Sequence, residues 1–465
     1  MFTLQQGQFG AVCGRRDFLR FGSGLALASF LSPVSALRAA APDGLRGGKA
    51  KSCILVYLLG GPPQLDTFDL KPEAPAEIRG PFKPIATNVP GTQICEHLPK
   101  LAAMADRYAL VRSVSHPNSN HTPMIYYTLT GRHTELPLVD NDVRPPQRTD
   151  FPHIGSVVSH LRQPRDVPGF VALPELAVRS STTGEFNRPR TPLRGGAGGY
   201  LGAACDPLSI NGAPGAAASV PYLTLPEGVS AERFEQRMGL LSVIESGRPP
   251  APATEQFQEM RRRAIMLTGA PGTTRNQLFS LADEPAAISE RYGKHRFGRS
   301  LQLARRLTEA GVPMVAVHFN EMTVCDGWDT HGDNFTALEN ELLPMLDQSL
   351  SALVEDLERR GTLDETLVVC MGEFGRSPKI NAQVGRDHWG PCSTTLLAGG
   401  GIRGGVVYGS SDRTASFPKS DSVDPVDIQA TMYHALGFDP EQLIRDQQNR
   451  PYTISTGQVI EKLLA

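Results

Sequence analysis

The chain has 465 residues, with 46 basic and 48 acidic side chains and a formal net charge of −2 at pH 7. This balance argues against a nucleic-acid partner, because such proteins neutralise phosphates with a clustered basic surface. The seven cysteines show no CxxC spacing, which argues against a zinc–thiolate site.

The first forty or so residues have the features of an export signal. Arg15 and Arg16 precede a short, weakly apolar run, and small residues follow around Ala36 and over 39–41. This order is typical of a twin-arginine signal, which directs folded proteins across a bacterial inner membrane. We predict a signal over residues 1–41, recognised by the twin-arginine export machinery, and a periplasmic or secreted mature chain. An ordinary N-terminal helix is the alternative.

Apolar runs alternate with helical patterns along the rest of the chain. Uninterrupted apolar runs are typical of strands buried on both faces of a parallel sheet. No run reaches the roughly 20 apolar residues needed to span a bilayer, so we expect no transmembrane segment in the mature chain. The predicted strands are 53–59, 108–114, 312–318, 367–371 and 394–397, and the predicted helices are 230–246, 254–267, 286–310 and 334–360.

This alternation predicts one large domain over residues 48–465, with a three-layer α/β/α fold and a mostly parallel central sheet. Pro344 should kink or split the last predicted helix. Between residues 188 and 226 Gly, Ala and Pro dominate, and hydrophobic periodicity is lost. Because the alternation resumes afterwards, we predict a surface insertion or lid there rather than a linker between domains.

Polar side chains follow the first two predicted strands. Asp66 and Asp69 follow the first strand, and His116 and His121 follow the second. In open α/β sheets ligands gather at the carboxyl ends of strands, so these side chains are candidate ligands. The alternative is a set of turns with capping Asp and Asn residues and surface histidines.

The densest group of potential metal ligands follows the strand predicted over 312–318. Asp326, Asp329 and His331 lie within six positions, and carboxylate and imidazole at this density hold divalent cations. Glu373 follows the next predicted strand, and His388 lies fifteen positions further on. A polar turn rich in Asp and Gly is the alternative.

Two arginines accompany these candidate ligands in the sequence. Arg376 and Arg386 carry guanidinium groups, which match tetrahedral oxyanions with two parallel hydrogen bonds. Either side chain could hold a phosphate or sulfate group. The alternative is that they satisfy strand-end carbonyls or pair with Asp387.

The order of these motifs resembles a family of exported bacterial proteins catalogued as domain of unknown function 1501, over nearly the whole mature chain. More distantly, it resembles the alkaline phosphatase and sulfatase superfamily, and that resemblance implies an alkaline-phosphatase-like version of the predicted fold. The segments that carry the resemblance are 60–69, 115–121, 328–331, 372–376 and 385–389.

The superfamily resemblance implies a divalent cation, such as Zn, Ca, Mg or Mn, held by Asp326 or Asp329 together with His331 and His388. One or two ions are expected, because a second cation would lie near other side chains that the resemblance also selects. Those side chains are Asp66, Glu373 and either His116 or His121. The chain departs from the superfamily there, because it lacks an Asp directly after the first strand and has Phe374 in place of a His.

The resemblance implies hydrolysis of a phosphate or sulfate ester of a small molecule or glycan. The superfamily places its nucleophile at the start of the helix after the second strand, where this chain has His121 and Thr122. Thr122 is a candidate nucleophile, activated by a metal, and Arg376 is a candidate for binding the oxyanion. Alternatively, His121 is a ligand and water is the nucleophile. A degenerate, non-catalytic relative that binds a glycan or a protein partner through the same cleft is the competing function.

Overall fold

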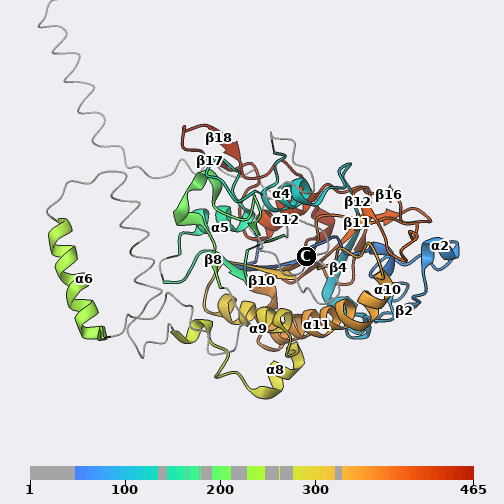
Figure 1. Cartoon of the computed structure of the whole chain (residues 1–465), viewed down its shortest axis with the longest axis horizontal. Coiled ribbons are helices and arrows are strands. Elements are labelled where there is room, and N and C mark those ends of the chain that lie inside the picture. The colour runs from blue at the N-terminus through green and yellow to red at the C-terminus, as the bar shows by residue number, and fades with distance from the viewer. Residues whose placement is uncertain are drawn as a thin grey trace, which may run out of the picture. The chain divides into compact units, whose positions relative to one another are not determined.

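An eight-stranded sheet forms the centre of the computed structural model (Figure 1). The structure describes residues 48–134, 144–164, 166–176, 178–179, 191–210, 228–246, 261, 276–319 and 327–465. The strands of the sheet are β1 (Ser52–Leu58), β4 (Tyr108–Val114), β5 (Val171–Leu173), β8 (Leu208–Ser209), β9 (Met314–Phe319), β10 (Thr366–Met371), β13 (Ser393–Ala398) and β14 (Val407–Tyr408).

The prediction of a mostly parallel sheet is confirmed. The strand order is β14-β4-β13-β10-β1-β9-β5-β8, and β13 runs antiparallel to both of its neighbours. The other neighbouring pairs in this sheet are parallel. The five predicted strands correspond to β1, β4, β9, β10 and β13, with ends displaced by no more than two residues.

Helices cover both faces of the sheet, which explains why its central strands are apolar without interruption. In β1, Ile54 and Val56 enter one hydrophobic core, whereas Leu55 and Tyr57 enter the other. Successive side chains of a strand point to opposite faces, so a strand between two helical layers must be apolar at every position. This arrangement confirms the three-layer α/β/α architecture.

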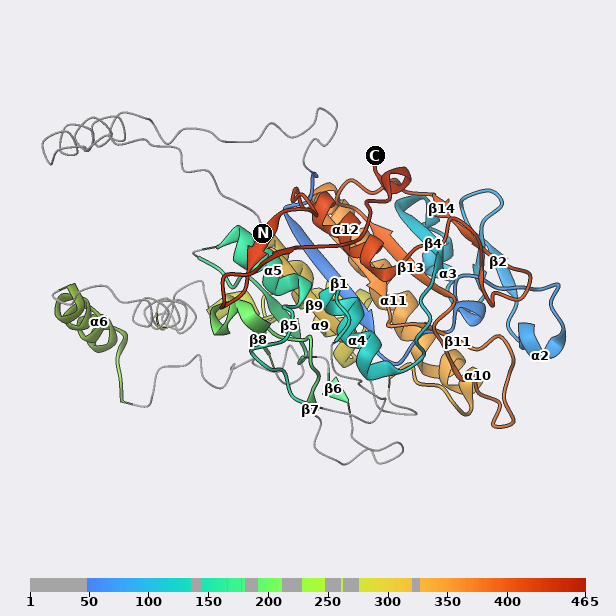
Figure 2. The ribbon, with the colours of Figure 1, turned by 90° about the horizontal axis from the view of Figure 1, so that it is seen from above.

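The two helical layers are visible in Figure 2, which looks onto one of them with the other behind the sheet. The nearer layer contributes Ile125, Val157 and Ile428 to its core, and the farther layer contributes Leu301 and Leu350. The nearer helices are α4 (His121–Thr130), α5 (Ile154–Arg162) and α12 (Pro425–Ala435), and the farther helices are α9 (Arg296–Glu309) and α11 (Leu343–Arg359).

Two long predicted helices are interrupted. The helix predicted over 286–310 is divided into α8 (Ala286–Tyr292) and α9 at Gly293, whose φ of 92° is incompatible with a right-handed helix. The helix predicted over 334–360 begins as α10 (Asn334–Ala337) and passes through a π-helical turn (Leu338–Leu342) into α11. The π-helical turn directly before Pro344 is the predicted interruption, which is therefore confirmed. Pro344 itself lies in the first turn of α11, where its missing N–H is tolerated.

Two other predicted helices have different outcomes. The helix predicted over 230–246 is observed as α6 (Ala231–Ser246). The helix predicted over 254–267 lies outside the described residues except at position 261. No helix in the described part of the chain has the length and apolar character needed to cross a membrane.

Short elements surround the main sheet. Two small helices, α2 (Ala76–Arg79) and α3 (Pro99–Ala102), follow β1 in the sequence. Five two-stranded antiparallel ribbons occur among the described residues. They pair β2 (Pro84–Ala86) with β3 (Gln93–Cys95), β6 (Val178–Arg179) with β7 (Thr191–Pro192), β11 (Gly375–Arg376) with β12 (His388–Trp389), β15 (Ser410–Ser411) with β16 (Pro418–Ser420), and β17 (Leu443–Arg445) with β18 (Pro451–Thr453).

The segments predicted as an export signal and as an insertion are only partly described. Residues 1–41 lie outside the described residues, as do residues 188–190 and 211–226 of the predicted insertion. The described part of the predicted insertion, 191–210, contributes to the domain. Leu193 is buried in a hydrophobic core, and β8 forms hydrogen bonds with β5 at the edge of the main sheet. Low periodicity concealed this contribution because β8 contains only two residues.

Candidate functional site

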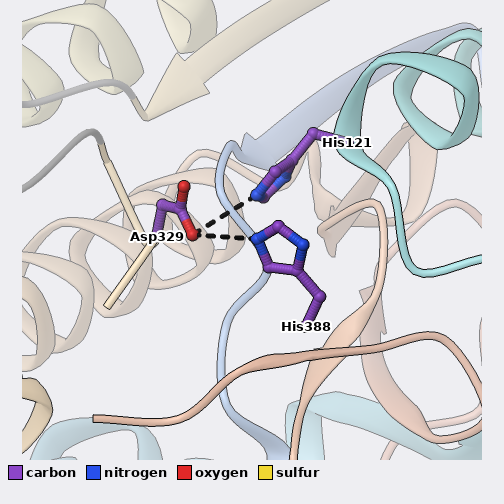
Figure 3. Close-up of side chains that lie close together, drawn as sticks. All are labelled: His121, Asp329 and His388. Atoms are coloured by element: carbon purple, nitrogen blue, oxygen red, sulfur yellow. Dashed lines mark hydrogen bonds and ion pairs between the residues drawn. The ribbon is translucent and has the colours of Figure 1, made fainter. Parts of the chain in front are cut away.

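Three side chains that lie far apart in the sequence meet near the carboxyl end of β1. Figure 3 shows His121, from the start of α4, and His388 pointing toward the carboxylate of Asp329. The Asp329 Oδ1 atom lies 3.3 Å from His121 Nε2 and 3.2 Å from His388 Nε2. One ligand atom from each of the three residues lies within 4.8 Å of the other two.

His331 joins this group on its solvent side. Its Nε2 atom lies 3.1 Å from Asp329 Oδ1 and 2.8 Å from His388 Nε2. The His331 side chain is 45% exposed, and its Nδ1 atom lies 3.3 Å from the Asp387 carboxylate. We call His121, Asp329, His331 and His388 the histidine–aspartate cluster.

Glycine at the end of β1 allows the chain around Asp329 to approach. The Trp328 N–H donates to the Leu59 carbonyl over 2.7 Å, which ties the 328–331 segment to β1. Gly60 has a φ of 111°, and a Cβ atom at this position would lie 2.5 Å from the backbone nitrogen of Asp329. A side chain at position 60 would therefore displace Asp329 from the cluster.

The charge of Asp329 is fixed by its surroundings. Burial alone would raise the pKa of the Asp329 carboxyl, but the Arg376 guanidinium and the His121 ring outweigh burial and hold that pKa well below its usual range. Arg376 is fully buried and donates a hydrogen bond to Asp329 Oδ1. Asp329 is therefore an ionised carboxylate, the form that binds a cation.

Arg376 is also part of the framework that holds the site together. The β11–β12 ribbon places it directly opposite His388. Its guanidinium donates to the Gly60 carbonyl, to the Gly61 carbonyl over 3.0 Å and to the Arg386 carbonyl over 3.1 Å. With the bond to Asp329 included, this side chain makes four hydrogen bonds. Three of them go to backbone carbonyls, as expected if Arg376 satisfies carbonyls at strand ends.

Glu373 contacts His121 from the side of the ring that faces away from Asp329. Its Oε1 atom lies 2.6 Å from His121 Nδ1 and accepts a hydrogen bond from the Gly60 N–H over 2.9 Å. A carboxylate at this distance requires a proton on His121 Nδ1. In the neutral form of the ring the Nε2 lone pair therefore faces Asp329, whereas in the protonated form Nε2 also carries a proton that points at Asp329. A lone pair facing a carboxylate oxygen is repulsive unless a proton or a metal ion lies between them.

Asp66 does not contact the cluster but forms a buried ion pair. Its two oxygens accept hydrogen bonds of 2.7 and 2.8 Å from Arg386, and both side chains are fully buried. Asn334 donates a third hydrogen bond to Asp66 over 2.9 Å. Both oxygens of Asp66, which was expected to bind a second cation, therefore already accept hydrogen bonds from protein groups. Arg386 pairs with Asp66 rather than with Asp387, and its guanidinium also donates to backbone carbonyls, as the other part of the alternative stated.

The remaining candidates are His116, Thr122 and Asp326. His116 Nε2 lies 2.8 Å from the backbone carbonyl of Glu373, and burial lowers the pKa of the His116 ring. This hydrogen bond occupies the ring nitrogen nearest to Glu373. Thr122 is buried in the first turn of α4, next to His121 in sequence. Asp326 lies outside the described residues.

Phe374 has a role that sequence reasoning did not predict. It is fully buried, and its ring centroid lies 4.6 Å from that of His121 and 5.0 Å from that of His388. The ring therefore packs against two members of the cluster from the apolar side. The only sequence feature that pointed to a place for Phe374 beside the cluster was its position directly after Glu373.

Comparison with known proteins identifies a family and a distant structural likeness. Residues 50–464 match the family described as protein of unknown function (DUF1501). No curated protein matches the sequence.

Solved structures with a similar arrangement include an alkaline phosphatase superfamily protein from Vibrio parahaemolyticus, with 11% identity, a TM-score of 0.40 and coverage of 90% of this chain and 72% of that one. The PsFucS1 sulfatase from Pseudoalteromonas sp. has 11% identity, a TM-score of 0.37 and the same coverage. The lipoteichoic acid synthase LtaP from Listeria monocytogenes has 9% identity, a TM-score of 0.35 and coverage of 88% and 76%. At these TM-scores the likeness carries no argument about function.

Proposed function

This chain belongs to the DUF1501 family, and we propose that it is a metal-dependent hydrolase of phosphate or sulfate esters. The observation that supports this proposal is the convergence of His121 and His388 on one carboxylate oxygen of Asp329. When the His121 ring is neutral, its hydrogen bond to Glu373 leaves the Nε2 lone pair facing that oxygen, and a cation between the two atoms would turn their repulsion into coordination.

The spacing of the ligand atoms suits a small divalent cation. A tetrahedral zinc ion with bonds of about 2.0–2.1 Å separates its ligand atoms by about 3.3 Å. Asp329 Oδ1 lies 3.3, 3.2 and 3.1 Å from the Nε2 atoms of His121, His388 and His331. A set with several imidazoles favours zinc over magnesium or calcium, which prefer oxygen ligands.

Each residue has a proposed task in ester hydrolysis. The cation, when bound, supplies Lewis acidity to an ester oxygen. His121, Asp329 and His388 would hold it, and His331, on the exposed side, would lie nearest to an entering substrate. The nucleophile is either the Thr122 hydroxyl or a water molecule beside the cluster.

We also propose that the protein acts outside the cytoplasm. The support is the Arg15–Arg16 pair followed by an apolar run and small residues, which is typical of twin-arginine export. The substrate would then be an extracytoplasmic ester of a small molecule or a glycan.

A second function has specific support in the two buried arginines. The guanidinium groups of Arg376 and Arg386 are engaged by backbone carbonyls and by carboxylates, so neither presents the free fork that grips a tetrahedral oxyanion. Phe374 also occupies a place where the superfamily resemblance implies a ligand. Under this alternative the protein keeps one structural metal ion or none, and binds a glycan or a protein partner through the same cleft.

Metal removal separates these functions. Protein purified without chelators should contain about one equivalent of zinc per chain, as measured by elemental analysis. Under the hydrolase proposal, it should cleave aryl phosphate or aryl sulfate, lose this activity with a chelator, and regain it with zinc. Bound zinc without turnover of either ester would favour the binding function. Protein without metal, or turnover that is insensitive to chelators, would contradict the metal site.

Glu373→Gln should weaken zinc binding by about 10- to 100-fold, because the amide accepts a weaker hydrogen bond from His121 and no longer raises the basicity of Nε2. Competition with a chromogenic chelator would measure the dissociation constant. Glu365→Gln is a matched control, because Glu365 is paired with Lys51 on the surface. Equal zinc affinity of Glu373→Gln and the wild type would show that Glu373 does not orient His121.

A further inference from the structure

A cavity with a volume of about 430 Å³ lies beside the second half of α4 and next to the β17–β18 ribbon. Figure 1 labels α4 and both strands of this ribbon. The lining residues of the cavity come from α4, from His133 and Thr134 after that helix, from the segment 147–151, from Arg194 and Tyr200, and from the turn and second strand of the ribbon. None of them belongs to the histidine–aspartate cluster. The volume falls within the range of about 300–1,000 Å³ that is usual for small-ligand sites.

Four aromatic rings supply the apolar part of the cavity wall. The Phe151 ring contacts Tyr200 and Tyr452 edge-on at centroid distances of 5.6 and 5.2 Å, and Tyr200 and Tyr452 stack at 5.7 Å. Tyr126 is linked to this group because its hydroxyl accepts a hydrogen bond from the Phe151 N–H over 2.8 Å. The mutual packing holds the rings in place before any ligand arrives, which lowers the entropic cost of binding.

The cavity wall is close to electrically neutral although three arginines border it. Each of these arginines has a carboxylate partner, so their charges are largely compensated and do not demand a strongly anionic ligand. The pairs are Arg148 with Asp206, Arg194 with Asp150, and Arg450 with Asp446.

Neutral polar groups complete the wall. Gln147, Gln447 and Gln448 are exposed residues that line the cavity, and each carries an amide that can both donate and accept hydrogen bonds. Among the described residues, the hydroxyl groups of Tyr200 and Tyr452 have no hydrogen-bond partner, although both residues line the cavity. The wall therefore offers uncommitted polar groups beside a fixed aromatic surface.

We propose that this cavity binds a neutral saccharide. The C–H face of a pyranose ring packs against an aromatic ring, and its hydroxyl groups need neighbours that donate and accept, as amides and phenols do. The proposal does not rest on the hydrolase function, because the cavity and the cluster share no residue.

Calorimetric titration of the full chain with cellotetraose, chitotetraose and maltotetraose tests this assignment. At least one of these should bind the wild type. Tyr452→Ala should weaken that binding by about tenfold through loss of the stacking surface. Gln447→Ala, which alters only an exposed side chain, should weaken it about threefold through loss of a hydrogen bond.

Two matched variants control for indirect effects. Gln93→Ala changes an exposed glutamine on β3, and His388→Ala changes the histidine–aspartate cluster, so both should bind the saccharide as the wild type does. Absence of binding by all three tetrasaccharides would overturn the proposal. So would binding that Gln447→Ala and Tyr452→Ala both leave unchanged, or a cavity that binds inorganic sulfate in preference to every saccharide.

Discussion

His388→Ala is expected to weaken zinc binding by more than about 100-fold and to abolish metal-dependent ester hydrolysis. His388 Nε2 lies 3.2 Å from Asp329 Oδ1 and 2.8 Å from His331 Nε2, so its loss removes a nitrogen that adjoins two other members of the cluster. Loss of an orienting partner already costs about 10- to 100-fold in metal affinity, and loss of a ligand should cost more. Competition with a chelator and turnover of aryl phosphate would measure the two effects.

The fold should survive this change. His388 is partly exposed in the short β11–β12 ribbon, and Arg376 retains its hydrogen bonds to Asp329 and to backbone carbonyls. The unfolding temperature of metal-free protein should therefore stay close to that of the wild type. His160→Ala, on α5, is a matched control that should leave zinc affinity unchanged. A His388→Ala protein that binds zinc normally would place the metal elsewhere.

Asp66→Ala is expected to lower the free energy of unfolding by about 3–5 kcal/mol, because it leaves the buried Arg386 charge without its carboxylate. Asp66 and Arg386 are both fully buried and joined by hydrogen bonds of 2.7 and 2.8 Å. Urea denaturation of metal-free protein would measure the change without a contribution from zinc binding.

An exposed ion pair provides the comparison for Asp66→Ala. Lys51→Ala breaks a surface pair with Glu365, whose side chains are 72% and 48% exposed, and should cost less than about 1 kcal/mol. Similar losses for both variants would show that the buried pair contributes no more than a surface pair.

Asp66→Ala should also reduce zinc affinity, because the Asp66–Arg386 ion pair connects segments that carry the histidine–aspartate cluster. Arg386 donates its backbone N–H to the Thr330 carbonyl over 3.1 Å, and Thr330 donates to Asn334, which in turn donates to Asp66. Loss of Asp66 would loosen the positions of His331 and His388, which adjoin Thr330 and Arg386 in sequence. This effect would be seen as weaker zinc binding at urea concentrations where the variant is still folded.

Most of the fold was predictable from the sequence because its signal is local. A strand covered by helices on both faces favours apolar side chains at successive positions, and this pattern is nearly continuous in β1, β9 and β10. In β4 and β13 it is limited to the shorter apolar runs 108–111 and 396–398. The short strand β8 escaped prediction because two residues carry no periodicity. The division of the helix predicted over 286–310 at Gly293 escaped it because one glycine inside a helical pattern does not reveal its φ.

The sequence alone determined which residues were candidates for the site, since polar side chains directly after buried strands must lie at one edge of the sheet. Only the tertiary structure decided their partners. Glu373 and Asp66 are both carboxylates after central strands, yet one contacts His121 and the other pairs with Arg386, 320 positions away. Hydrogen bonds and ion pairs act over about 3 Å, so a residue's role depends on which distant side chain the folded backbone brings within that distance.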